Sequence, residues 1–239
     1  MNLSLFSSAG LEMIFAWVHF LAGIAWIGML YFFNFVQVPY MAEADAVSKP
    51  SYMTKLLPRA LWWFRWGALF TLISGLSIVG VWMATMGPSI MSSSRGVGIS
   101  IGMLLGILMA ANVWFVIWPK QKIVIASETA KAAGGQADPA QPDAAARAFI
   151  ASRTNTLFSI PMLFFMGAAS RLSFFGGEPA MSPGVPMGII AAIVLLFEVN
   201  VFVGKKGQGM SKMLDKHVAV IHVGLVLALG FYFILDGML

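Results

Sequence analysis

His19, the one histidine in the apolar run at residues 17–35, is the residue whose type and surroundings best suit cofactor chemistry. Ala16, Ala22 and Gly23 stand three before, three after and four after it. These positions share one face of a helix, so the imidazole projects from a face of very small side chains. Such a face leaves room either for a flat cofactor such as haem or for a closely packed neighbouring helix.

Cysteine is absent from the chain, which excludes disulfides, cysteine-ligated iron–sulfur clusters and the CxxCH attachment of c-type haem. The other histidines, His217 and His222, point about 140° apart around a helix and cannot share one site. We therefore take His19 and His222 as the candidate iron ligands of haem b. Helix rise places these two on the order of 15 Å apart in depth, so they need not bind the same haem.

A second group of polar residues falls at one depth within the apolar segments. Glu198, Asn112, Arg65 and Asn155 each lie a few residues inside the same end of their segments. Polar groups in a bilayer are costly and usually pair with one another, so Glu198 is expected to pair with His222 or with Arg65. Two interpretations stay open: a structural network that satisfies its own hydrogen bonds, and a cofactor, quinone or proton site that opens inward.

The elements that must position these residues are six apolar segments of about 20 residues, the length that crosses a bilayer as a helix. The chain is 59% hydrophobic and 10% charged, whereas soluble domains are about a quarter charged. We therefore predict an all-α polytopic membrane helix bundle, a single domain over residues 1–239, in a bacterial inner membrane. The predicted spans are 11–36, 61–86, 97–118, 154–175, 185–204 and 217–236.

Lysine and arginine concentrate in alternate connections between these spans. Thirteen of the 15 lie in or beside the first, third and fifth connections. The positive-inside rule then places these connections in the cytoplasm and both termini outside. The third connection is rich in Ala, Gly and Pro, so residues from about 121 to 150 are expected to form a flexible loop. The basic residues form no patch interleaved with aromatics, so no nucleic-acid partner is expected despite the net charge of +5.

Small residues recur every four positions in two of the predicted spans. The stripes are Gly98, Gly102, Gly106 and Ala110 in the third span, and Gly67, Thr71 and Gly75 in the second. Helices in lipid approach closely across small residues. We therefore expect these stripes to join the second and third spans, or to join protomers of a homo-oligomer.

Three segments resemble one protein family. WVHFLAGIAWIG (17–28), MAANVWFVIWPKQK (109–122) and SRTNTLFSIPMLFFM (152–166) are similar to the N-terminal membrane domain of bacterial membrane-bound urate oxidases, also called urate hydroxylases. The resemblance covers most of residues 11–170, and it implies that the membrane histidine of this family is His19. A helix with the pattern H…W-I-G also occurs in other haem-binding membrane proteins. We accordingly expect His19, Gly23 and Trp26 to contact the cofactor.

The chain departs from that family pattern in two respects. The family has a histidine beside the asparagine of the third segment, where this chain has Thr154 beside Asn155. Enzymes of the family also carry a cytochrome c domain after the membrane part, and a sequence without cysteine has no such domain. We therefore expect electrons to pass to a separate partner, either a cytochrome or another membrane redox subunit.

These features together predict an integral membrane protein that binds haem b and acts in electron transfer. The resemblance implies an oxidoreductase of the urate oxidase type that needs a separate electron acceptor, although the sequence leaves open whether the chain is an enzyme. One alternative is a non-catalytic subunit of a larger respiratory or photosynthetic membrane complex, which the glycine stripes and the absent histidine would suit. Another is a proton-coupled transporter, which Glu198 and the inner polar residues would suit.

Overall fold

The computed structural model describes residues 4–176 and 178–239, and every regular element in these residues is helical, which confirms the predicted all-α class. The α-helices are α1 (Ser8–Tyr31), α2 (Val38–Glu43), α3 (Ser48–Ser51), α4 (Leu57–Met86), α5 (Ser94–Ala111), α6 (Trp118–Ala132), α7 (Gln141–Ala168), α8 (Gly184–Val203) and α9 (His217–Met238). The π-helical segments are η2 (Phe32–Gln37), η3 (Tyr52–Leu56) and η5 (Asn112–Ile117). The 3-10 segments are η1 (Ser4–Phe6), η4 (Pro88–Ser92) and η6 (Gly209–Asp215).

Five helical stretches of the described chain are long and apolar enough to cross a membrane. They are Ser8–Glu43, Ser48–Met86, Ser94–Ala132, Gly184–Val203 and His217–Met238. Their length and composition are those of membrane-spanning helices. The remaining predicted span, 154–175, overlaps α7, which is not among the five.

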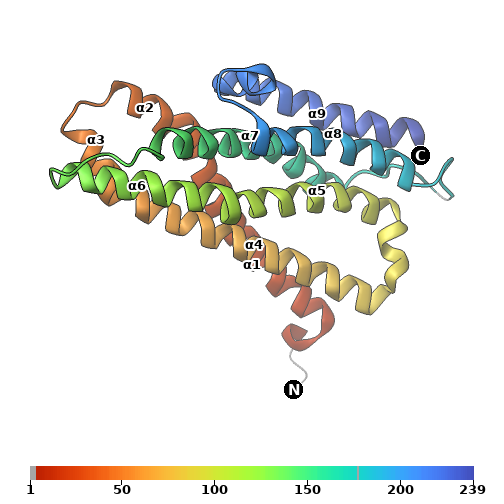
Figure 1. The fold of residues 1–239 in the computed structure, drawn as a ribbon. Coiled ribbons are helices and arrows are strands. Elements are labelled where there is room, and N and C mark those ends of the chain that lie inside the picture. Colours follow the sequence, from red (N-terminus) through yellow and green to blue (C-terminus); the bar gives the residue numbers. More distant parts are fainter. Residues whose placement is uncertain (1–3, 177) are drawn as a thin grey trace.

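The position of α7 explains why it is less apolar than the others. It contacts α5, α6, α8 and α9, and Figure 1 shows it running between α5 and α9. Arg153, Thr154 and Asn155 in its middle are at most 1% exposed. A helix enclosed by other helices faces protein rather than lipid and therefore tolerates polar side chains. The sixth membrane crossing stays a prediction.

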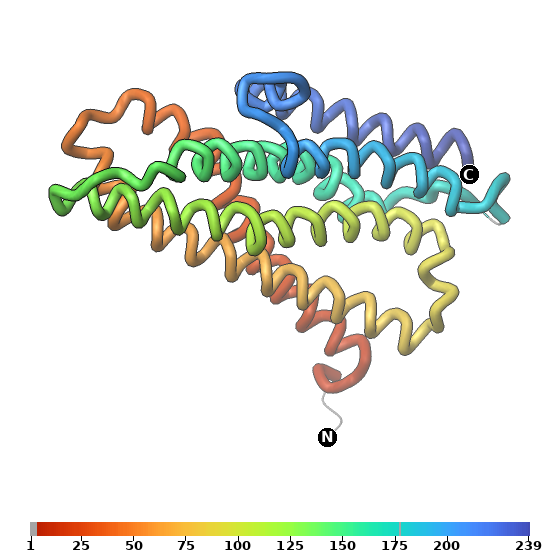
Figure 2. The backbone as a smooth tube through the Cα atoms, viewed as in Figure 1, coloured from red at the N-terminus to blue at the C-terminus, as the bar shows by residue number. Residues whose placement is uncertain are grey.

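The first four connections between the long helices alternate between the two ends of the bundle. Figure 2 shows residues 44–47 and 133–140 at one end, and residues 87–93, 169–176 and 178–183 at the other. The predicted topology requires this alternation. The side of the membrane on which each end lies, and with it the position of both termini, stays a prediction.

The predicted flexible loop over residues 121–150 is mostly helical. Helix α6 continues to Ala132 and α7 begins at Gln141, so residues 133–140 alone connect them. The glycines of the region, Gly134 and Gly135, fall inside this short connection, and the alanines around it favour helix. The prediction from composition therefore made the loop too long, since residues 121–132 and 141–150 are helical.

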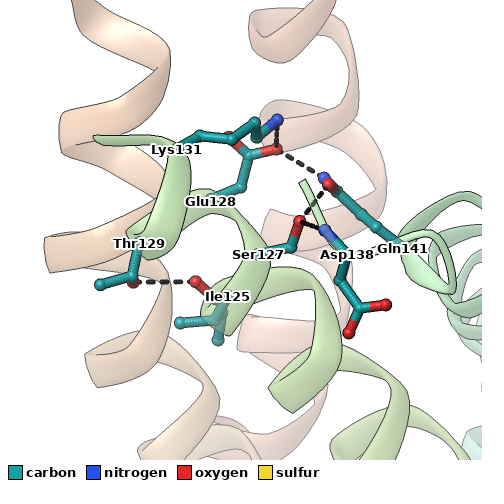
Figure 3. A network of polar contacts seen from close by, with 7 residues as sticks. All are labelled: Ile125, Ser127, Glu128, Thr129, Lys131, Asp138 and Gln141. Atoms are coloured by element: carbon teal, nitrogen blue, oxygen red, sulfur yellow. Dashed lines mark hydrogen bonds and ion pairs between the residues drawn. The ribbon is translucent and has the colours of Figure 1, made fainter. Parts of the chain in front are cut away.

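Polar side chains tie the two ends of the α6–α7 connection together (Figure 3). The Ser127 hydroxyl donates to Gln141 Oε1 at 2.6 Å and accepts from the backbone N–H of Asp138 at 2.8 Å. Gln141 Nε2 donates to Glu128, which also pairs with Lys131. These bonds hold the end of α6 against the start of α7.

The glycine stripes pack against different helices from those predicted. A Cβ at Gly67 would lie 3.1 Å from the backbone N of Trp26 and 3.2 Å from the backbone O of Ala22, both on α1. A Cβ at Gly102 would lie 3.1 Å from the Met166 side chain on α7. Helix α4 therefore packs on α1, and α5 packs on α7. The second and third spans do contact each other, but not through these stripes. That part of the prediction was wrong, because the spacing identifies a closely packed face but not its partner, and the alternative of a homo-oligomer stays a prediction.

Candidate cofactor site

A cavity of about 350 Å³ lies between α1, α4, α5 and α7. His19, Gly23 and Trp26, the three residues predicted to contact a cofactor, all line its wall. Thr71 is the only other lining residue with a polar side chain among the described residues, and the rest of the wall is apolar. A mostly apolar cavity with a few convergent polar groups is typical of small-molecule and cofactor sites.

The hydrogen bonds of His19 fix the orientation of its ring. Nδ1 lies 2.8 Å from the backbone oxygen of Thr71, so Nδ1 carries the proton and donates it to this carbonyl. The Ser74 hydroxyl lies 3.3 Å from the same nitrogen. Nε2 has no hydrogen bond within the described chain, and it is therefore the nitrogen available to a ligand. Metal-binding histidines usually donate their other ring N–H to a carbonyl or carboxylate in this way.

The small residues around His19 serve helix packing and the cavity at once. A Cβ at Gly75 of α4 would lie 2.9 Å from Cε1 and 3.1 Å from Nδ1 of His19, so the imidazole rests directly on this glycine. A Cβ at Gly23, one turn along α1 from His19, would meet only Thr71, at 3.9 Å. Gly75 makes room for the His19 ring, whereas the absence of a side chain at Gly23 leaves space in the cavity.

Methionines supply a second kind of donor in the same cavity. Met103 of α5 and Met162 and Met166 of α7 all line it. Gly106 and Gly102 of α5 make room for the last two, since Cβ atoms there would lie 3.6 Å from Met162 Sδ and 3.2 Å from Met166 Sδ. A thioether can serve as an axial ligand of haem iron together with histidine. With 17 methionines in the chain, the sequence did not single these out.

Trp26 adds a buried donor to this set. Its side chain is 1% exposed, and its Nε1–H has no hydrogen-bond partner in the described chain. An unpartnered buried donor is costly unless a bound group accepts its proton. The cavity thus combines an imidazole, three thioethers, a free indole N–H and apolar walls, which are the kinds of group that haem sites use.

His222, the other candidate iron ligand, does not line this cavity. It lies on α9 with its side chain exposed, and its Nδ1 is 2.8 Å from the backbone oxygen of Val218 on the same helix. The structure therefore does not bring His19 and His222 together. Helix rise had already separated the two histidines in depth, and the structure shows that they also lie on faces that do not meet.

Three of the four residues of the predicted inner cluster do meet. Asn112 Nδ2 donates to Asn155 Oδ1 and to Glu198 Oε2, both at 3.0 Å. Asn155 Nδ2 donates to the backbone oxygen of Met109 at 2.9 Å. We call Asn112, Asn155 and Glu198 the inner network. It joins η5, α7 and α8, and all three side chains are buried.

Arg65 lies apart from the inner network. Its guanidinium stacks on the Trp118 ring with 3.9 Å between Cζ and the ring centroid, and it lies 5.6 Å from the Trp114 ring. Helix α4 packs on α1 and meets η5 and α6 through these indoles, so Arg65 does not reach α8. The carboxylate of Glu198 accepts from Asn112, and the predicted pairs of Glu198 with Arg65 or His222 are not formed.

Arg153 is a buried charge that the sequence did not reveal. By position it is one of the basic residues beside the third connection, yet its side chain is 1% exposed. Nε and Nη1 have no hydrogen-bond partner in the described residues, and Cζ lies 5.1 Å from the Phe149 ring centroid. Only the packing of α7 among other helices distinguishes it from a solvated arginine.

The inner network predicts a difference between two substitutions of Glu198. Glu198→Leu leaves one of the two N–H groups of the Asn112 amide without a partner, while the other still donates to Asn155, and should lower the free energy of unfolding by about 1–3 kcal/mol. Glu198→Gln keeps an oxygen that accepts from Asn112 and should cost much less. Unfolding in detergent micelles, followed by circular dichroism, measures both. Equal losses for the two variants would show that this hydrogen bond does not stabilise the fold.

The family model described as "Urate oxidase N-terminal" matches residues 78–229. This range contains the whole inner network, and it begins after His19 in the sequence. The comparisons with curated proteins and with solved structures found no match to the chain. Because the matched range is more than half of a chain whose apolar helices are those of a membrane protein, this protein belongs to the urate oxidase N-terminal family.

Proposed function

We propose that this protein is a membrane oxidoreductase of the urate oxidase type, which binds haem b through His19 and passes electrons to a separate redox partner. The observation that carries the proposal is the state of His19. Its Nδ1–H is committed to the Thr71 carbonyl, and its Nε2 is free at a cavity lined by apolar side chains and methionines. Haem bound there would supply a reversible one-electron carrier, tuned by its ligands and its burial.

Each polar group at the cavity has a distinct part in this proposal. The Thr71 carbonyl sets the tautomer of His19 and orients its ring. The indole N–H of Trp26 is free to donate to an acceptor on the bound group. The apolar wall from α5 and α7 excludes water, and Met103, Met162 and Met166 offer thioether sulfur as a second ligand.

The proposal also covers the setting of the protein. We place it in the bacterial inner membrane with α7 as the sixth crossing, both termini outside and the α2–α3 and α6–α7 connections in the cytoplasm. The arrangement of connections at alternate ends of the bundle supports this topology (Figure 2). The partner is then a cytochrome or another membrane redox subunit that meets the bundle from its lipid-facing or outer side.

An absorption spectrum tests the proposal directly. The full chain, produced in cells supplied with a haem precursor and purified in detergent, is expected to show a Soret band that shifts on reduction with dithionite. Pyridine haemochrome analysis should identify the non-covalent haem as b-type, since no cysteine is present to attach it. A colourless protein that also fails to take up added haemin would contradict the proposal. Such a protein found in complex with redox subunits would instead support the accessory-subunit alternative.

A further inference from the structure

A second cavity, of about 420 Å³, is lined by residues of α6 and α7 on either side of the α6–α7 connection. Figure 1 shows this connection at one end of the bundle. We call this second cavity the inner cavity. Segment η2, helices α4, α6 and α7 and the connection after α8 all contribute to its wall. Neither the family match nor the proposed haem site assigns a function to it.

All three π-helical segments of the described chain reach this cavity. Phe33, Asn34 and Gln37 come from η2, Met53 comes from η3 and Ile117 comes from η5. A π-helical turn costs free energy relative to an α-helical one and is found most often at functional sites. The convergence of three such turns on one cavity indicates that the cavity has a function.

The polar groups of the inner cavity offer both donors and acceptors. Asn34 is held in place because its Nδ2 donates to the backbone oxygen of Leu30 at 2.8 Å and to Ser152 Oγ at 2.9 Å. The side chains of Gln37 and Gln121 also line the wall. Gln121 Oε1 is buried and has no hydrogen-bond partner in the described chain. A buried acceptor of this kind is satisfied if the cavity holds a molecule with an N–H or O–H group.

The charge at the inner cavity is positive. Lys206 lines it, and Lys206 Nζ lies 4.4 Å from the centroid of the Phe149 ring, which also lines it. The buried guanidinium of Arg153 lies 5.1 Å from the same ring. Asp215 acts on the charge of Arg153 and balances part of it. The exposed Lys206 is the cation among the described lining residues, which include no aspartate or glutamate. An anion is the occupant that this arrangement favours.

The apolar part of the wall favours a flat molecule. Phe33, Phe64 and Phe149 present aromatic rings to the cavity, and Met41 and Met53 present flexible thioethers. Rings and thioethers pack well against the faces of a planar molecule, while the amides and the lysine can form hydrogen bonds with groups along its edge. The whole combination describes a planar, anionic ring with N–H and C=O groups along its edge.

We propose that the inner cavity binds a small planar anion with ring N–H and C=O groups, and that it is the substrate site of the protein. As a substrate site, the inner cavity rests on the proposed function, and urate is then the member of this class to use as the probe. The continuous helical stretch of α1 and η2 lines both cavities: Gly28 of α1 borders the haem cavity and Phe33 of η2 borders the inner cavity, separated by about 8 Å of helix rise. A bound molecule is thus close to the proposed electron carrier.

Isothermal titration calorimetry on the full chain in detergent tests the site with three probes at mildly acidic pH. Urate is an anion with ring N–H and C=O groups, xanthine has a similar ring without the charge, and benzoate has the charge without those groups. We expect urate to bind most tightly. No heat with urate, or equal affinity for urate and benzoate, would overturn the proposal.

Two neighbouring lysines provide the matched variants. Lys206→Met removes the charge that lines the inner cavity and should weaken urate binding about 10- to 100-fold, the effect of losing a hydrogen bond to a charged group. Lys205 is exposed as Lys206 is, but it does not line the cavity, so Lys205→Met should leave the affinity unchanged. Equal affinities for the two variants would overturn the assignment of Lys206.

A third variant separates this inference from the haem proposal. His19→Ala lies outside the inner cavity and should keep urate binding, whatever its effect on haem. Urate binding by a protein with no Soret band would refute the haem proposal and leave the inner cavity standing. A Soret band in a protein that does not bind urate would do the reverse.

Discussion

The His19→Ala variant is expected to be purified without a Soret band, while the wild-type chain carries one. His19 is the only histidine in the wall of the cavity, among the described residues, and its Nε2 is the only imidazole nitrogen there that is free to bind iron. Thioethers alone are weak ligands, so Met103, Met162 and Met166 should not retain the haem without it. Absorption spectra at equal protein concentration measure the loss, and added imidazole should restore part of the band by occupying the vacated space.

His222→Ala is the matched control for this experiment. His222 is exposed on α9 and bonds to Val218 of its own helix, so its removal should leave the spectrum unchanged. Circular dichroism of both variants checks that the helices are intact. A full Soret band in His19→Ala, or its loss in His222→Ala, would remove His19 from the centre of the proposed function.

Gly67→Leu is expected to cause the largest loss of stability of any single glycine replacement on α4. A Cβ at Gly67 would lie 3.1 Å from the backbone N of Trp26 and 3.2 Å from the backbone O of Ala22. Backbone atoms cannot move aside as the end of a side chain can, so α1 must separate from α4. Overpacking of this kind typically costs 1–3 kcal/mol, and we expect about 3 kcal/mol because the whole leucine side chain must be accommodated.

Gly80→Leu on the same helix is the control. Gly80 is exposed, and a Cβ there would meet nothing within 4 Å. The same chemical change should therefore alter the free energy of unfolding by no more than about 0.5 kcal/mol. Thermal unfolding in detergent compares the two. Similar stability of the two variants would show that α1 and α4 are not closely packed at Gly67.

The fold class follows from composition and period, which are local properties of the chain. Runs of about 20 apolar residues must hide their backbone polar groups in helices when they enter a bilayer, so the all-α class was predictable. The central position of α7 was not, because its polar residues Arg153, Thr154 and Asn155 are tolerated only when other helices surround them. Hydropathy records how apolar a segment is, and it does not record what covers the segment.

The candidate site also has a part that the sequence predicted and a part that it did not. The small residues beside His19 and the inner depth of Asn112, Asn155 and Glu198 could be read from spacing along each helix, which has a fixed rise. The inner network formed as a group, while Arg65 and His222 turned to other faces. Depth along a helix is set by the sequence, but the direction of a side chain around the bundle depends on how the helices pack.

The sequence by itself determined the membrane helices, the histidine on a face of small residues and the depth at which the polar groups lie. Only the tertiary structure decided that Gly75 seats the His19 ring, that methionines of α5 and α7 complete its cavity, and that three π-helical segments meet at a second, positively charged cavity. The reason is physical. Spacing along a helix is fixed by local backbone hydrogen bonds, whereas a cavity is made by residues far apart in the chain, and its existence depends on which helix faces pack together.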